Sequence, residues 1–134
     1  MEINKITEIT IGCAYKVINT LGPGFLEKVY ENALAHEIDK SGLKVTQQYP
    51  MQIKYDGVIV GEYTADLLIE DQVIVELKTV KELDPFHMAQ CINYLRATGK
   101  NVCPLINFYK AQLEYKRIVN NFDETNINRN VKSI

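Results

Sequence analysis

Three of the five charged residues between Tyr63 and Val80, the most strand-like part of the sequence, lie inside its apolar runs. Asp66, Glu76 and Lys78 each interrupt a run of apolar residues, and charged groups rarely occupy such positions without a partner or a function. Carboxylate oxygens are the ligands that Mg²⁺ and Mn²⁺ prefer, and a lysine beside such a metal can hold a nucleophilic water or neutralise charge that develops on a phosphate. The plainer interpretation is an exposed sheet face with a Lys–Glu pair that contributes little stability.

The two carboxylates meet only if the hairpin that joins their strands has the right register. A pairing centred on Asp71 places Asp66 opposite Glu76 and Leu68 opposite Ile74. A two-residue turn would shift the pairing by one residue and mix charged with apolar side chains on the same face. The pattern therefore favours a loop with an odd number of residues. Two carboxylates that face each other repel, and a divalent cation between them would remove the repulsion.

Two expected helices carry further candidates for a site. Glu27 follows the Gly-Pro-Gly at residues 22–24 and lies in the first turn of a helix, where a carboxylate also suits the helix dipole without any further function. His87, Gln90 and Tyr94 follow one another at i, i+3 and i+7 and form a polar stripe along a later helix. The plainer interpretation of that stripe is a solvated helix edge.

The elements that position these residues follow from hydrophobic periodicity. Apolar residues recur at helical spacing in some segments and at every second residue in others. Asp84 and Pro85 indicate the start of the third helix. The expected helices cover residues 4–21, 25–40 and 85–97, and the expected strands cover residues 45–55, 58–69, 73–79, 105–109 and 113–119. This α/β order, α-α-β-β-β-α-β-β, predicts a small mixed sheet covered by helices.

Length and composition set limits on the class of protein. The chain has 134 residues, of which 46% are hydrophobic, and this suits one domain over residues 1–122 with a polar tail at 123–134. It has no apolar run long enough to span a bilayer and no secretory signature at its start. Its three cysteines include no CxxC pair, so a cytoplasmic protein with reduced thiols is expected. The net charge of −2 argues against gripping long nucleic acid by charge alone.

Taken together, the motifs resemble a known family. Asp66 followed by ELK at residues 76–78 resembles the signature of the PD-(D/E)XK nuclease superfamily. GFLEKVY at residues 24–30 looks like the motif that names the GxxExxY protein family, a branch of that superfamily. LDPFHMAQCINYL and LINF, further along the chain, are similar to that family in order and spacing. The resemblance covers roughly residues 5–120, and the combined motifs are more specific than any one of them.

The resemblance implies a fold, a reaction and a set of catalytic residues. The fold would be an αβββαβ core, here with an extra N-terminal helix, and the reaction would be metal-dependent hydrolysis of phosphodiester bonds. Asp66, Glu76 and Glu27 would be ligands of Mg²⁺ or Mn²⁺. Lys78 would face the attacking water or the phosphate, and nucleic acid, DNA in the first place, would be the substrate.

The resemblance also assigns roles on the later helix. Gln90 and Tyr94 resemble a QxxxY element that lines the active site in related nucleases, and His87 matches a histidine common just upstream of that glutamine. The chain departs from the family pattern at Ile18, where members often carry histidine, and at the Cys103-Pro104 pair (residues 103–104), where they often carry Gly-Leu. The second departure is expected only to shift the start of a strand, since proline is tolerated there.

Other functions remain open at this stage. The leading interpretation is a nuclease. The alternative is a non-catalytic module that keeps the nuclease fold to bind nucleic acid or protein, and a structural subunit without any role in nucleic acid is a third. The small, slightly acidic chain would bind nucleic acid weakly by itself, so a homodimer or a protein partner is also possible. Association with a membrane is not expected.

Overall fold

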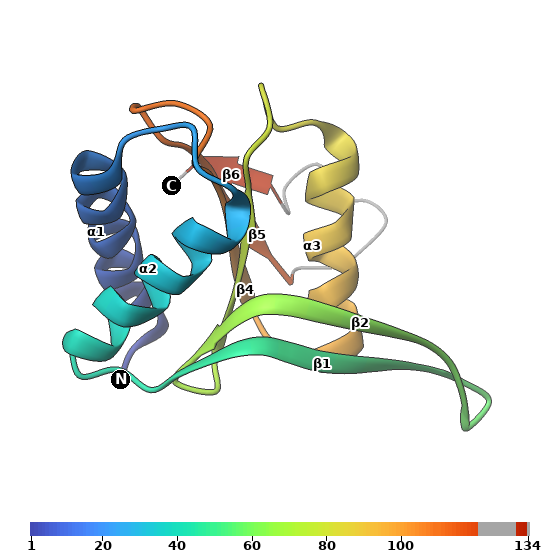
Figure 1. Cartoon of the computed structure of the whole chain (residues 1–134). Coiled ribbons are helices and arrows are strands. Elements are labelled where there is room, and N and C mark those ends of the chain that lie inside the picture. Colours follow the sequence, from blue (N-terminus) through green and yellow to red (C-terminus); the bar gives the residue numbers. More distant parts are fainter. Residues whose placement is uncertain (121–130, 134) are drawn as a thin grey trace.

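Helices cover both faces of one six-stranded sheet in the computed structural model, which describes residues 1–120 and 131–133 (Figure 1). The helices are α1 (Ile3–Leu21), α2 (Glu27–Lys40) and α3 (Pro85–Thr98). The strands are β1 (Val45–Tyr55), β2 (Val58–Ile69), β3 (Val73–Lys78), β4 (Val102–Asn107), β5 (Glu114–Val119) and β6 (Val131–Ser133). The expected α/β class and the order of the first eight elements are confirmed.

Most boundaries agree with the sequence pattern, and two features differ. The fourth strand begins at Val102, three residues before the expected start, and so contains Pro104 instead of following it. The strand extends this far because all of its residues are buried between neighbouring strands. β6 was not expected, since its residues belong to the predicted polar tail. The rest of that tail, 123–130 and 134, lies outside the described residues, and the domain boundary at residue 122 stays a prediction.

The strands follow one another in space as they do in sequence, from β1 to β6. Every neighbouring pair is antiparallel except β3 and β4, which run parallel and are joined through α3. Such a connection needs a crossover, and here the crossover helix covers one face of the sheet while α1 and α2 cover the other (Figure 1). None of the described helices is long and apolar enough to cross a membrane.

Alternation along β3 decides which side chains face α3. Val73, Val75 and Leu77 belong to the core beneath α1 and α2, whereas Ile74 belongs to the core beneath α3. Glu76 therefore points to the α3 side of the sheet. Both faces of β3 are covered, and this explains why the strand reads as an almost continuous apolar run in the sequence.

The β2–β3 hairpin has the predicted register. Leu68 pairs with Ile74, and the loop between the strands is the expected three residues, 70–72. Glu70 and Asp71 both have positive φ, 53° and 57°, and the Gln72 N–H closes the turn onto the carbonyl of Ile69 at 3.0 Å. The odd-length loop thus places the carboxylates of β2 and β3 on the same face.

The β1–β2 hairpin is the longest feature of the sheet and extends beyond the helices (Figure 1). It turns at Asp56 and Gly57, which have φ of 52° and 77° as a two-residue turn of this kind requires. β1 forms one edge of the sheet. Gln48 in this strand also has a positive φ, 55°, which is uncommon for a residue other than glycine.

Tyr30 fixes the start of α2 against the turn that precedes it. The fully buried Tyr30 hydroxyl donates to the Gly22 carbonyl at 2.7 Å and accepts from the Phe25 N–H at 3.1 Å. Its ring stacks on Phe108 with the centroids 5.0 Å apart. Gly22 and Gly24 have φ of 73° and 108°, values that favour glycine. Gly22, together with Gly24 and Tyr30 of GFLEKVY, therefore holds the helix end that carries Glu27.

We predict that Tyr30→Phe lowers the free energy of unfolding by roughly 1–3 kcal/mol, because the Gly22 carbonyl and the Phe25 N–H lose a buried partner. Urea unfolding of the purified chain measures this loss. Tyr55→Phe is the matched control, since Tyr55 is 75% exposed at the end of the hairpin, and it should unfold like the wild type. Equal stability of all three proteins would contradict the anchoring role of the Tyr30 hydroxyl.

Candidate active site

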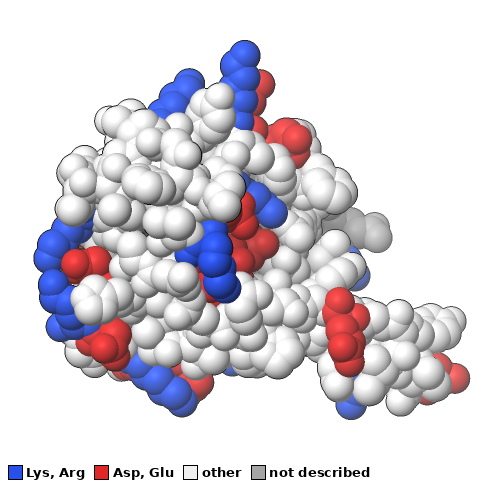
Figure 2. Space-filling view, in the orientation of Figure 1, with Lys and Arg blue, Asp and Glu red and all other residues white. Residues whose placement is uncertain are grey.

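Four carboxylates from three elements come together near the start of α2. Glu27 and Glu31 belong to α2, Asp66 to β2 and Glu76 to β3. Figure 2 shows acidic atoms gathered in a hollow in the middle of one face of the molecule, with basic atoms around them. Lys78, at the end of β3, lies within this group.

Asp66 and Glu76 hold each other in place through the backbone of the opposite strand. The Asp66 N–H donates to Glu76 Oε1 at 3.2 Å, and the Leu77 N–H donates to Asp66 Oδ2 at 2.8 Å. The regular ladder between β2 and β3 ends at the pair Leu67–Val75, so carboxylate oxygens accept the backbone bonds that follow. The predicted juxtaposition of these two residues is therefore present, with Glu76 only 5% exposed.

Burial and mutual repulsion make it costly to ionise this pair. Burial, followed by the charge of Asp66, raises the pKa of Glu76 to about 8, although Lys78 opposes the shift. Burial also raises the pKa of Asp66. The Lys78 ammonium lies 3.7 Å from Glu76 Oε2, and the Tyr94 hydroxyl donates to the same oxygen at 3.2 Å. One lysine does not compensate the carboxylates around it.

Glu27 joins the same electrostatic group from α2. Burial raises its pKa, the charge of Asp66 raises it further, and Lys78 and a backbone hydrogen bond from Thr79 act in the opposite direction. The structure thus brings the four predicted catalytic residues, Glu27, Asp66, Glu76 and Lys78, into one site. Their catalytic roles stay predictions.

The residues predicted on α3 have three different surroundings. Tyr94 is 2% exposed and contacts Glu76, so it lies inside the site and not on a solvated edge. His87 takes part in a helix cap, because its Nδ1 accepts from the Asp84 N–H while Asp84 Oδ1 accepts from the His87 N–H, both at 3.1 Å. Gln90 Oε1 is buried and has no hydrogen-bond partner. A role of His87 and Gln90 in substrate binding stays a prediction.

Glu31, Gln47 and Gln48 belong to the site and were missed in the sequence. Gln47 Nε2 and Gln48 Nε2 each donate to a different oxygen of Glu31 at 2.8 Å. Neighbouring strand residues normally point to opposite faces, but the positive φ of Gln48 lets both amides reach one carboxylate. Gln48 Nε2 also lies 3.5 Å from Asp66 Oδ1. The only feature of the sequence that pointed to these residues was the pair of adjacent glutamines inside an expected strand.

Asn107 is a second residue that the sequence analysis did not single out. It pairs with Lys78 across the parallel strands and is 3% exposed. Its side chain accepts from the Val80 N–H at 3.0 Å and donates to the Val80 carbonyl at 2.7 Å. The chain directly after Lys78 is therefore held in one conformation, which limits where the lysine can point.

The oxygen donors fit a hard divalent cation, although they do not form a complete metal cluster. No group of three or more histidine, cysteine, aspartate or glutamate side chains has a metal-holding arrangement within residues 1–120 and 131–133. The three expected ligands, Glu27, Asp66 and Glu76, are thus not ready-made as a set. Mg²⁺ usually takes only one or two carboxylates and completes its shell with water and phosphate oxygens. A cation there would also offset the repulsion that raises the pKa of Glu76.

Comparison with known proteins adds a family and a fold. The sequence model of the PD-(D/E)XK nuclease superfamily matches residues 4–118. No curated protein is similar enough to count as a match. The crystal structure of SSO0001 aligns with a TM-score of 0.54 at 18% identity, covering 94% of this chain and 63% of that one. An alkaline exonuclease (LHK-Exo) from Laribacter hongkongensis aligns with a TM-score of 0.49 at 15% identity, covering 92% and 86%.

We predict that the metal-free protein loses stability as the pH rises from about 5 to about 8. The folded state keeps a proton on Glu76 until its pKa of about 8, whereas an unfolded glutamate releases it near 4.5. The folded state then binds more protons across this window, so the free energy of unfolding falls as the pH rises. Glu76→Gln should flatten this dependence in melting curves recorded with EDTA. Glu62→Gln, which removes an exposed carboxylate from β2, should retain it.

Proposed function

The chain belongs to the PD-(D/E)XK nuclease superfamily, and from that premise we propose that it is a Mg²⁺- or Mn²⁺-dependent nuclease. The substrate would be nucleic acid, DNA in the first place, and the reaction hydrolysis of a phosphodiester bond. The observation that carries the proposal is the pair of partly buried Asp66 and buried Glu76 with Lys78 beside it. Such a pair costs stability unless a cation binds, and local rules tend to be violated in this way at functional sites.

The residues of the site have separate roles in this proposal. Asp66 and Glu76 would hold the metal, and Glu27 would complete the site from α2. The bound metal would supply charge neutralisation at the phosphate and a more acidic water. Lys78, which is 18% exposed and close to Glu76, would donate to the attacking water or to a phosphate oxygen. The water oxygen then bonds to phosphorus while the bond to the leaving sugar oxygen breaks.

Other residues keep the carboxylates and the lysine in position. The Tyr94 hydroxyl orients Glu76 through Oε2, and the amide of Gln48 connects Glu31 with Asp66. Asn107 holds the backbone that follows Lys78. Positioning of this kind matters because misplacement of catalytic groups by about 1 Å can reduce rates by about a hundredfold.

We further propose that the chain is a member of the GxxExxY branch and acts in the cytoplasm. The support for the branch is GFLEKVY, whose tyrosine and glycine help to hold the helix end that carries Glu27. The support for the compartment is Cys13, Cys91 and Cys103, which are all unpaired and buried.

A non-catalytic binding module is the second candidate. It is favoured by the bonds from backbone N–H groups to Asp66 and Glu76, since such bonds also stabilise a scaffold that binds no metal. An assay on purified protein separates the two functions. Cleavage of DNA that EDTA abolishes and Mn²⁺ restores would support the nuclease, and metal-independent binding without cleavage would support the module.

We predict that Asp66→Asn separates the effect of the charge from the effect of the metal. Without metal the variant should be at least as stable as the wild type, because it lacks the Asp66 charge that opposes ionisation of Glu76. With metal at ten times Kd, binding should stabilise the wild type by roughly 1.4 kcal/mol, or roughly 3–6 °C in Tm, and leave the variant unchanged. If the variant is strongly destabilised and neither protein responds to metal, Asp66 is a structural residue.

We predict that Lys78→Met abolishes cleavage while metal binding persists or tightens, because a positive charge next to the metal is removed. Metal titration by calorimetry and a cleavage assay measure the two effects separately. Lys81→Met is a control that removes a nearby exposed lysine, and it should cleave at close to the wild-type rate. Wild-type turnover by Lys78→Met would exclude a catalytic role for this lysine.

A further inference from the structure

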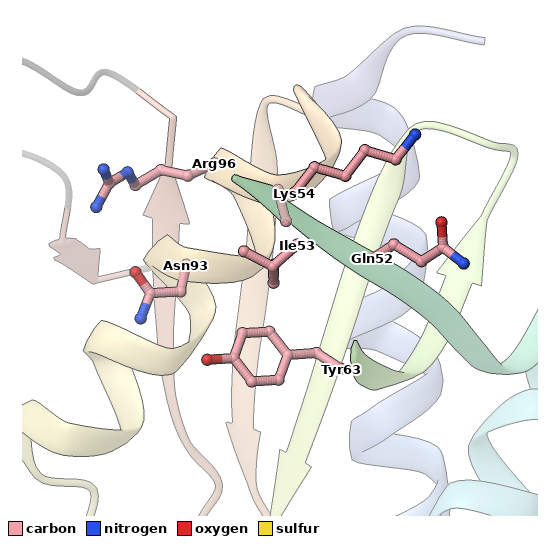
Figure 3. Close-up of a pocket in the computed structure, with 7 residues that line it drawn as sticks. Gln52, Ile53, Lys54, Tyr63, Asn93 and Arg96 are labelled. Carbon is pink, nitrogen blue, oxygen red and sulfur yellow. The ribbon is translucent and has the colours of Figure 1, made fainter. Parts of the chain in front are cut away.

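A groove of about 770 Å³ lies between the β1–β2 hairpin and α3. Figure 3 shows the Tyr63 ring of β2 extending toward α3, which carries Asn93, with Ile53 of β1 above the ring. A second hollow, of about 190 Å³, continues from it and shares Tyr63 and Asn93 with the groove. Phe86 and Gln90 of α3 line this smaller hollow, which we name the aromatic niche.

Two aromatic rings line the aromatic niche, Phe86 from α3 and Tyr63 from β2. Phe86 is 76% exposed and Tyr63 is 43% exposed, although both are large apolar side chains that folding would normally cover. Exposed rings that line a common hollow offer flat faces to a planar ligand. Stacking of a nucleobase on such a ring contributes about 1–3 kcal/mol and tolerates every base.

Gln90 lines the same hollow and carries a hydrogen-bonding group that has no partner. Its Oε1 is buried and has no partner, and leaving a buried acceptor unsatisfied costs free energy. This oxygen has almost no exposed surface, so the Gln90 side chain must turn toward the hollow before a ligand with N–H groups on its edge can satisfy it. Nucleobases have such edges, and they become accessible to side chains when the strand is unpaired.

The aromatic niche is next to the carboxylate site. The Tyr63 ring contacts the Tyr94 ring, with centroids 5.8 Å apart, and the Tyr94 hydroxyl donates to Glu76. Tyr63 and Tyr94 therefore connect the aromatic niche with Glu76. A nucleotide whose base occupies the niche would direct its neighbouring phosphate toward the proposed metal ligands.

The larger groove differs in charge from the carboxylate site. Its lining residues include Lys54 and Arg96, and neither hollow is lined by an aspartate or a glutamate. In Figure 3 these two side chains extend outward on opposite sides of the groove. Cations at the rim and rings at the centre match a nucleic-acid strand, whose phosphates lie outside and whose bases turn inward.

We propose that the aromatic niche binds one unpaired nucleobase, so that the substrate of this chain is single-stranded nucleic acid or a single-stranded end. This inference rests on the proposed nuclease function and names its substrate class. The base stacks between Phe86 and Tyr63 and donates to Gln90, and the adjoining strand follows the groove past Arg96. A duplex does not fit this arrangement, because its bases are already stacked and paired.

Binding can be measured without cleavage in the full chain that carries Lys78→Met, in Mg²⁺, by fluorescence anisotropy. The probes are a short labelled single-stranded oligodeoxynucleotide, an abasic strand of the same length, and a blunt hairpin duplex; a gel verifies that each probe stays intact. We expect the single strand to bind most tightly. Adding Phe86→Ala should weaken its binding roughly 5- to 150-fold, the equivalent of one stacked base, and leave the abasic strand unaffected.

Two further variants separate recognition from folding. Tyr55→Ala removes an exposed ring that lines neither hollow and should bind like its parent. Gln90→Met should keep or raise Tm, since it removes an unsatisfied oxygen, and should still weaken binding of the single strand.

Equal affinity for normal and abasic strands, or equal effects of Phe86→Ala and Tyr55→Ala, would overturn the aromatic niche even if the wild type cleaves DNA. Tighter binding of the duplex than of the single strand would overturn it as well. Base-dependent binding of the single strand by a chain that never cleaves would support the niche and refute the nuclease. The two proposals therefore fail on different observations.

Discussion

Two carboxylates side by side at the end of a strand pair, one buried and one partly buried, are the constraint on which this structure depends. Asp66 and Glu76 accept hydrogen bonds from the backbone where the ladder between β2 and β3 stops. This arrangement requires the three-residue loop at 70–72, because any shift by one residue would exchange the faces. It also requires covering elements on both sides of the sheet. The fold therefore buries Glu76 and leaves Asp66 partly exposed.

Two buried glutamates of the carboxylate site, Glu31 and Glu76, differ in how well hydrogen-bond donors stabilise their charged forms. Burial acts to raise the pKa of Glu31, but hydrogen bonds from Gln47, Lys28 and Gln48 hold it below its ordinary value. Glu76 receives fewer donors and has a raised pKa. A carboxylate with a full set of donors needs no other partner, so Glu31 acts as a support. A cation beside Glu76 would favour its ionised form, which its own donors do not stabilise enough.

The sequence predicts those parts of the fold that local patterns determine. Strands 45–55 and 58–69 follow from alternation and from the Asp56-Gly57 turn (residues 56–57), and the pairing of Leu68 with Ile74 follows from keeping charged and apolar faces apart. These features depend on neighbours in the chain or on one hairpin. The carboxylate pair was found for the same reason, since both of its members lie on that hairpin.

The missed features depend on contacts between distant segments. The left-handed backbone of Gln48 is explained by Glu31 on α2, which no local pattern around residue 48 reveals. The cap formed by His87 competes with its expected position in a polar stripe, because Asp84 precedes it by one helical turn. The early start of β4 reflects burial by its neighbours, which outweighs the unfavourable effect of Pro104. Tertiary contacts decided each of these cases.

The open edge at β1 has a consequence for how copies of the chain meet at high concentration. An edge strand presents unpaired backbone groups that can add a strand from another molecule, and such addition leads to aggregation. Pro50 lacks an N–H, and the left-handed backbone of Gln48 interrupts the regular edge. Both interruptions lie in the half of β1 nearest the core. The outer half, residues 51–55, is therefore the segment of this edge most open to strand addition, with Lys54 as its charged residue.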